Sequence, residues 1–197
     1  MAKEYLKNIY RMLFRNGVGT PVWKAKFESF GANSNIAYPT LLINPWNVNI
    51  GSNTTILKFA RLQNFVSELE KNPRILIGDR CYIGFFFTIL NGSTVRIGND
   101  VLFASHVIIT SENHGTDPES AIPYMDQTLS SKPVAIGDGC WIGEKVCIMP
   151  GVTIGKKSIV GGGSVVTKSI PEYSIAVGNP AKVIKRYNFE THLWEKV

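Results

Sequence analysis

The sequence predicts an all-β fold, a prism of about three faces built from stacked coils of short parallel strands. From residue 136 the chain runs as six consecutive hexads that each begin with Ile or Val: IGDGCW, IGEKVC, IMPGVT, IGKKSI, VGGGSV and VTKSIP. The same six-residue spacing recurs in three earlier trios of apolar residues. This spacing fits neither the helical period of 3.6 nor plain strand alternation, but it suits short strands that each point one aliphatic side chain inward before a turn.

The three earlier trios extend the prism towards the N-terminus. Their apolar positions are residues 50, 56 and 62, then 77, 83 and 89, then 97, 103 and 109. In the later run, glycine takes the second place of four hexads, and a small or β-branched residue takes the fifth place throughout, from Cys140 to Ile170. Glycine permits a tight corner. We therefore expect each coil to pair with the coils above and below it and to bury a continuous aliphatic column.

Breaks in the six-residue phase mark loops. Ile109 and Ile136 are separated by 27 positions, four hexads plus three, so residues 110–133 are predicted to form an extruded loop. Smaller breaks fall at the polar residues 63–74 and at Asn91-Gly92, which indicates a turn. Because loops on a rigid scaffold often carry function, the long loop is the first candidate for a site.

The coils are predicted to occupy residues 29–187, between an N-terminal segment of residues 1–28 and a C-terminal tail of residues 188–197. The N-terminal segment is expected to be an amphipathic helix with a lead-in, because basic residues recur every four places beside an apolar face. They are Lys3, Lys7, Arg11 and Arg15. The helix would cap the first coil or pack on a neighbouring subunit. Contact of residues 1–16 with an anionic membrane surface is the alternative.

Composition narrows the class of protein. The 197 residues are 44% hydrophobic and 18% charged, which predicts one globular domain and excludes a disordered chain. No window approaches the roughly 18 uninterrupted apolar residues of a membrane span. Cys81, Cys140 and Cys147 lack the spacing of a zinc site or a disulfide framework, and the N-terminus does not resemble a signal peptide. We expect a cytoplasmic protein with reduced thiols, at the inner face of the membrane if the N-terminal helix binds lipid.

The net charge of +6 suggests an anionic partner, and it is concentrated at the two ends of the chain. Residues 1–26 hold six bases and one acid (+5), residues 27–155 eight bases and eleven acids (−3), and residues 156–197 seven bases and three acids (+4). Interleaved aromatic residues or a known motif for nucleic-acid binding are missing, so nucleic acid is not the expected partner.

Three segments together carry a family resemblance. The hexads of residues 136–171, the following PEYSIAVGNPAKVIKR and the ENHG of the long loop resemble the left-handed β-helix acyltransferases built from hexapeptide repeats. The closest pattern is that of the saccharide O-acetyltransferases, which include galactoside and maltose acetyltransferases and enzymes that modify capsule, exopolysaccharide and lipopolysaccharide sugars. The resemblance covers about residues 30–187. It implies a left-handed coil, acetyl-CoA as co-substrate, no required metal, a saccharide acceptor and a homotrimer with active sites between subunits.

The proposed chemistry needs a base, because an alcohol is a poor nucleophile near neutral pH. Histidine is the side chain suited to that task. His192 lies in the charged C-terminal segment and His106 in a regular coil, whereas His114 lies in the loop, where the base of the family falls. We predict that His114 takes the hydroxyl proton while the oxygen attacks the acetyl carbonyl, with backbone N–H groups stabilising the oxyanion. Cys140 and Cys147 fall in regular hexads and are interpreted as core residues.

The resemblance also implies residues for the coenzyme. A groove beside the small-residue hexads would hold the pantetheine arm. The residues that match it are Gly143, Glu144, Gly162, Thr167 and Lys168. Lys182 and Lys185 fall where the family has basic residues for the phosphates, and Trp141 where an aromatic ring covers the active-site tunnel.

Two positions depart from the pattern of the family. Gly84 stands where galactoside and maltose acetyltransferases carry an asparagine near the reaction centre, and Asn91 or Asn113 would compensate by binding the substrate. Glu144 stands where a small polar residue is common, which leaves only its backbone contact as expected. Both departures point away from simple galactoside or maltose acceptors.

Three alternatives remain open at this stage. An N-acetyltransferase of a nucleotide-linked amino sugar shares the fold and the coenzyme. A non-catalytic scaffold of stacked coils would bind no acetyl-CoA. A β-helix carbonic anhydrase would need three converging histidines, and only His106 and His114 lie in the body of the predicted coils.

Overall fold

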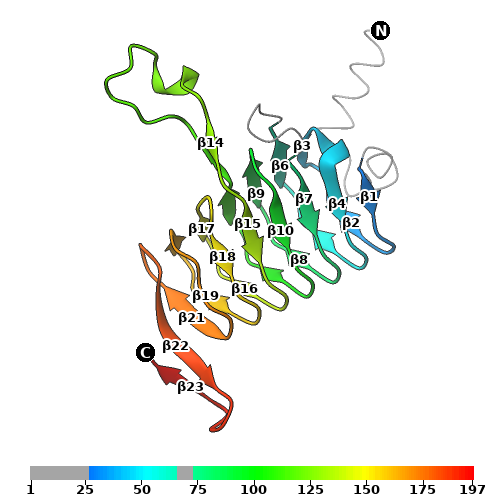
Figure 1. Cartoon of the computed structure of the whole chain (residues 1–197). Coiled ribbons are helices and arrows are strands. Elements are labelled where there is room, and N and C mark those ends of the chain that lie inside the picture. The colour runs from blue at the N-terminus through cyan, green and yellow to red at the C-terminus, as the bar shows by residue number, and fades with distance from the viewer. Residues whose placement is uncertain (1–26, 66–72) are drawn as a thin grey trace.

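A computed structural model describes residues 27–65 and 73–197. The predicted N-terminal helix, with its proposed membrane contact at residues 1–16, therefore lies outside the described residues. Within them the chain is a prism of stacked coils, with two short 3-10 helices, η1 (Pro45–Asn47) and η2 (Tyr124–Asp126), as its only helical segments (Figure 1).

Each coil contributes one short strand to each of three parallel sheets. Sheet A contains β1 (Ser29–Phe30), β4 (Val48–Ile50), β7 (Ile75–Ile77), β10 (Val95–Ile97), β15 (Val134–Ile136) and β18 (Thr153–Ile154). Sheet B begins with β2 (Asn35–Ile36), β5 (Thr55–Ile56), β8 (Tyr82–Ile83), β11 (Leu102–Phe103), β16 (Trp141–Ile142), β19 (Ile159–Val160) and β21 (Ser174–Val177). Sheet C contains β3 (Leu41–Ile43), β6 (Arg61–Asn64), β9 (Thr88–Asn91), β12 (Ile108–Thr110), β17 (Cys147–Ile148) and β20 (Val165–Val166). The corners AB, BC and CA are named for the sheets that they join.

The core is the aliphatic column that the hexads predict. In sheet A the strand register stacks one isoleucine of each coil on the next, and each is at most 4% exposed. These residues are Ile50, Ile77, Ile97, Ile136 and Ile154. Cys81 and Cys140 fill the fifth hexad place and are buried, and Cys147 is half-buried. Burial raises the pKa of all three thiols, which keeps them protonated and weakly reactive near neutral pH.

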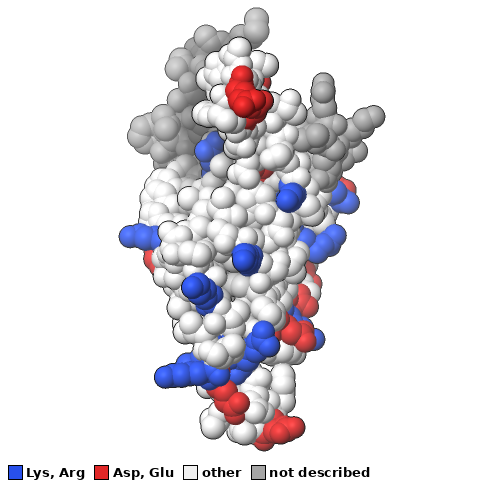
Figure 2. All heavy atoms as spheres, turned by 60° about the vertical axis from the view of Figure 1, so that its left-hand side comes forward, with Lys and Arg blue, Asp and Glu red and all other residues white. Residues whose placement is uncertain are grey.

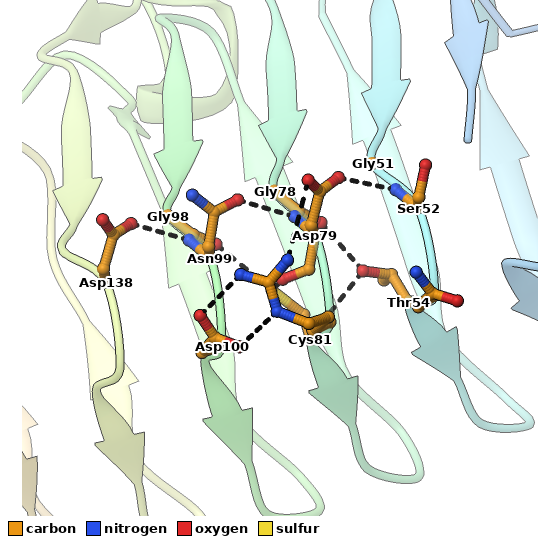
Figure 3. A network of polar contacts seen from close by, with 12 residues as sticks. Gly51, Ser52, Thr54, Gly78, Asp79, Cys81, Gly98, Asn99, Asp100 and Asp138 are labelled. Atoms are coloured by element: carbon orange, nitrogen blue, oxygen red, sulfur yellow. Dashed lines mark hydrogen bonds and ion pairs between the residues drawn. The ribbon is translucent and has the colours of Figure 1, made fainter. Parts of the chain in front are cut away.

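Corner AB is braced by side chains that reach back to the preceding coil (Figure 3). Asp79 Oδ1 accepts the N–H of Ser52 at 2.7 Å, Asn99 Oδ1 accepts the N–H of Asp79 at 2.8 Å, and Asp138 Oδ1 accepts the N–H of Asn99 at 2.7 Å. The coils approach closely here, because a Cβ added to Gly78 would lie 2.5 Å from the carbonyl oxygen of Gly98. The side-chain ladder therefore satisfies corner N–H groups that sheet pairing leaves free.

The long loop leaves the prism at corner CA, as predicted. Thr110 still belongs to β12, and the loop opens with β13 (Glu112–Asn113), which pairs antiparallel with β14 (Ser130–Ser131). The loop therefore has a hydrogen-bonded stem, which begins about two residues later than the phase break alone indicates. In Figure 1 its tip projects beyond the coils.

The C-terminal residues correct one prediction. Residues 188–197 are not a tail, because β22 (Lys182–Asn188) and β23 (Leu193–Lys196) add an antiparallel hairpin to the end of sheet B. Packing between aromatic rings accounts for the order of this segment. The ring centroids of Tyr187 and Trp194 are 5.3 Å apart, and those of Tyr187 and Phe189 are 5.1 Å apart.

Removing the middle of the corner ladder should destabilise the prism. Asn99→Ala leaves the N–H of Asp79 without its acceptor, and we expect a loss of about 1–2 kcal/mol in the free energy of unfolding. Asn99→Asp keeps an Oδ1 acceptor and is the matched control. Urea denaturation followed by circular dichroism measures both, and equal midpoints for the two variants would contradict the bracing role.

Candidate active site

The site residues predicted from the sequence fall on two different edges of sheet C. One set lies at corner CA. It consists of His114, on the loop after β12, and of Thr167 and Lys168, which follow β20. A second set lies at corner BC or on the outer face of sheet B beside it. These residues are Trp141, Gly143, Glu144, Gly162, Lys182 and Lys185.

His114 follows directly after the β13 strand and is exposed in a groove of the loop. The groove is lined by Asn113, His114, Gly115, Thr116, Asp117, Tyr124 and Ser130. Gln127 fixes the turn of the loop, because its Oε1 accepts the N–H of Asp117 at 3.0 Å and its Nε2 donates to the carbonyl oxygen of Asp117 at 2.9 Å. The imidazole is therefore presented to a ligand by a loop that its own side chains hold in shape.

Glu112 lies at the base of the same loop and is half-buried. Its Oε2 has no hydrogen-bond partner among the described residues. A Cβ added to Gly92 would lie 2.8 Å from that oxygen, so the glycine leaves room for the carboxylate. Burial raises the pKa of Glu112, while the positive charges of His114 and Arg61 act in the opposite direction. The carboxyl group of Glu112, whose charged form is disfavoured by burial, is thus two residues before the predicted base His114.

The two asparagines predicted to bind substrate differ in their surroundings. Asn113 is exposed and lines the groove beside His114. Asn91 is instead the last residue of β9, with no exposed surface, and the turn begins after it. Both polar atoms of its side chain are buried and have no hydrogen-bond partner within residues 27–65 and 73–197. Asn91 therefore cannot contact an acceptor from inside the corner, which corrects that expectation.

Corner BC explains both departures from the family pattern. A Cβ at Gly84 would lie 2.7 Å from the backbone N of Ser105, so the corner has no room for an asparagine at this position. Glu144 Oε2 accepts the N–H of Ser105 at 3.0 Å, which gives the side chain a bracing role. The close approach continues at Gly143, where a Cβ would lie 2.6 Å from the backbone N of Gly162. These glycines are needed for coil stacking, whether or not a ligand touches them.

The outer face of sheet B carries a row that joins the predicted aromatic and basic residues. The register aligns Trp141 with Ile159, Ile159 with Ile175, Ile175 with Lys185, and Lys185 with Lys196. Trp141 and Lys185 therefore lie three strands apart, roughly 14 Å, on one line. Lys182 lies at the BC end of the same hairpin, paired with Val177.

Sequence reasoning missed Lys196, which stands beside Lys185 in the strand register. The signal that could have found it is the pair of short segments KVIKRYN and LWEK on either side of FETH, since two such runs joined by a short polar segment are typical of a hairpin. Figure 2 shows a cluster of acidic side chains at the end of the molecule that carries the loop, and basic side chains scattered from there down to the opposite end, where further acidic side chains also lie.

The other histidines do not join His114. His106 is exposed at corner BC, across sheet C from the loop, and His192 lies in the turn of the C-terminal hairpin. Over residues 27–65 and 73–197, no group of three or more His, Cys, Asp or Glu side chains is arranged to hold a metal ion. The same residues contain no helix long and apolar enough to cross a membrane.

This chain is similar to a known family of transferases and to named acetyltransferases. The family model described as bacterial transferase hexapeptide (six repeats) matches residues 133–168. The chain is 41% identical over 167 residues, 82% of its length and 83% of the relative's, to WbbJ of Escherichia coli K12, a protein assigned to lipopolysaccharide biosynthesis as an O-acetyl transferase.

Two solved structures have the same fold. A maltose O-acetyltransferase from Clostridium difficile 630 has a TM-score of 0.60 and 31% identity, over 93% of this chain and 84% of that one. AntD, an N-acyltransferase from Bacillus cereus solved with dTDP and 3-hydroxybutyryl-CoA, has a TM-score of 0.75 and 23% identity, over 89% of this chain and 92% of that one. The three-sheet prism is accordingly a left-handed β-helix of hexapeptide repeats.

The raised pKa of Glu112 predicts a pH-dependent stability. A carboxyl group whose pKa is higher in the folded chain stabilises the fold while protonated, and that contribution is lost as the pH rises through the raised pKa. Glu112→Gln removes the buried charge, so the variant should gain up to about 1 kcal/mol relative to the parent at pH values above the raised pKa, and nothing at pH values below the ordinary pKa of a glutamate. Thermal melts across this range measure it, with the exposed Glu119→Gln as control. A gain that does not change with pH would contradict the assignment.

Proposed function

Because this chain belongs to the hexapeptide-repeat transferase family, we propose that it transfers the acetyl group of acetyl-CoA to a hydroxyl of a saccharide, with His114 as general base. The observation that carries the proposal is the exposed imidazole of His114 in a groove of a self-braced loop. Asn113 in the same groove can hydrogen-bond a sugar hydroxyl.

The reaction needs one proton acceptor and no acyl-enzyme. The neutral imidazole takes the proton of the acceptor hydroxyl as its oxygen bonds to the acetyl carbon. The tetrahedral intermediate carries its negative charge on the former carbonyl oxygen, which backbone N–H groups stabilise. When the carbon–sulfur bond breaks, the leaving thiolate takes the proton from the imidazolium. The thiols of the chain take no part, because burial keeps them protonated.

Acetyl-CoA fits the row on sheet B and the glycines of corner BC. Lys185 and Lys196 provide adjacent cations for the phosphates at the C-terminal end of the row. The exposed ring of Trp141 lies towards the loop-bearing end, where the thioester would be. This orientation places the charged end of the coenzyme on the basic part of the chain and its reactive end next to corner BC.

We further propose a homotrimer in which each site is shared by two subunits. Exposed apolar side chains lie on sheets B and C, for example Tyr82, Leu102 and Ile108, at 41–47% exposure. Sheet A instead presents outward residues such as Arg96 and Thr153. Contact between the apolar faces of neighbouring prisms would bury this surface. It would also bring the CA edge of one chain, with His114, to corner BC of the next.

Loss of the base should abolish most of the transfer. We expect His114→Ala to reduce kcat at least 100-fold with an unchanged melting temperature, since the side chain is exposed. Release of free coenzyme A from acetyl-CoA is measured over free sugars, lipid-linked saccharides and nucleotide-linked amino sugars. His192→Asn is the matched control. Full activity in folded His114→Ala would exclude this base, and a preference for the amino sugars would favour N-acetylation.

A shared site predicts complementation between two defective subunits. Lys185→Ala should raise the KM for acetyl-CoA about tenfold without changing that for the acceptor, because it removes one charge-assisted phosphate contact. Trimers reassembled from equal amounts of His114→Ala and Lys185→Ala chains should regain about a quarter of the parental activity at low acetyl-CoA. If the mixed trimers are no more active than the mean of the two single variants measured separately, each site lies within one chain.

A further inference from the structure

Three aromatic rings form an exposed column along corner BC. The ring centroids of Phe59 and Phe86 are 4.9 Å apart with planes inclined by 13°, and those of Phe86 and His106 are 4.7 Å apart with planes inclined by 10°. Phe59 is 48% and Phe86 45% exposed, and the neighbouring Phe85 is 41% exposed. The outward edges of the rings therefore form an apolar strip over three successive coils.

The backbone under this column is unfavourable for the residues that occupy it. Phe59, Phe86 and His106 have φ values of 64°, 56° and 61°, in the left-handed region that bulky side chains rarely adopt. The equivalent turn positions of corner AB share this left-handed backbone but are mostly polar residues or glycine, as at Asn53, Arg80 and Gly139, with Tyr173 the aromatic exception. Rings at strained, exposed positions do not serve the core, and strain of this kind is often retained for binding.

The column meets the proposed coenzyme groove end to end. Ser105, beside His106, donates its backbone N–H to Glu144 and accepts the N–H of Lys145 at 3.0 Å through its carbonyl oxygen. Corner BC therefore carries the ring column on the coils of residues 59–106 and the glycine groove on the coils that follow. With the coenzyme along the glycine groove, as proposed above, the ring column is the part of corner BC that the coenzyme leaves free for an acceptor.

The chemistry of the strip is amphipathic. The phenyl edges offer apolar contact, the two nitrogens of the His106 imidazole can bond hydroxyl groups, and Lys145 continues the turn positions of the column into the next coil. A pyranose ring has a matching division between C–H groups and a rim of hydroxyls. Resting on the proposed acetyl transfer, we propose that the Phe59–Phe86–His106 column binds the sugar ring of the acceptor.

A substitution at Phe86 can remove the central ring of the column without destabilising the fold. Asparagine tolerates the left-handed backbone, so Phe86→Asn should not lower the melting temperature while it removes the central ring. We expect the KM for the acceptor to rise about tenfold, with the KM for acetyl-CoA within twofold. Phe86→Tyr keeps the ring and should keep the parental KM. Trp46→Ala removes an exposed ring of η1, at corner CA instead of corner BC, and is the control.

Three outcomes would overturn the proposal. A lower melting temperature of Phe86→Asn with an unchanged acceptor KM would make the column structural, and dissociation of the oligomer in light scattering would make it an interface between copies. Retention of the parental acceptor KM in a stable oligomer would also exclude it.

Direct binding distinguishes this proposal from the proposed reaction. Sugar binding is measured by ligand-observed NMR on His114→Ala, with and without Phe86→Asn. A free oligosaccharide and a nucleotide-linked sugar are both tested, to show which of the two supplies the pyranose ring that binds. If Phe86→Asn abolishes sugar binding but the protein with His114 intact transfers no acetyl group to any of the acceptors, the reaction is refuted and the sugar-binding role of the column is supported. If Phe86→Asn leaves acetyl transfer unchanged in the protein with His114 intact, the reaction is supported and the sugar-binding role of the column is refuted.

Discussion

The structure depends on the close stacking of one coil of backbone on the next. Each strand is two to four residues long through the coils, too short to be stable alone, and gains its hydrogen bonds only from equivalent strands above and below. At the corners the backbones come so close that Gly78, Gly84 and Gly143 leave no room for a Cβ. Side chains such as Asp79 and Glu144 then complete the hydrogen bonding between coils.

The same stacking decides where chemistry can occur. A rigid prism holds outward side chains in fixed rows, so Trp141 and Lys185 keep one line while His114 stands across sheet C on a loop. A single chain cannot bring the two edges of that sheet together. A site that uses both edges requires a second prism, and the apolar outer faces of sheets B and C are suited to receive one. Symmetry of the assembly would thus substitute for flexibility of the chain.

The sequence located the loop and its histidine, because both interrupt an otherwise regular repeat. It misjudged residues whose environment depends on neighbours distant in the chain. Asn91 precedes a glycine and resembles a turn residue, but Gly92 is there to admit the carboxylate of Glu112, and the asparagine is buried. The C-terminal segment resembled a tail because its hairpin pattern is short and lies outside the hexads, and the ring packing between β22 and β23 that stabilises it is a contact across the hairpin.

What the sequence by itself determined was the hexad phase, and with it the parallel coils, the aliphatic column and the place where the chain leaves the prism. All three follow from the six-residue repeat of apolar residues, which can be recognised from short stretches of sequence alone. Only the tertiary structure decided that the aromatic turn positions of three coils stack into one exposed column, that Lys196 stands beside Lys185, and that the Glu144 carboxylate is engaged by Ser105. Each of these depends on contact between successive coils or across a hairpin, where register and not sequence distance sets which side chains meet.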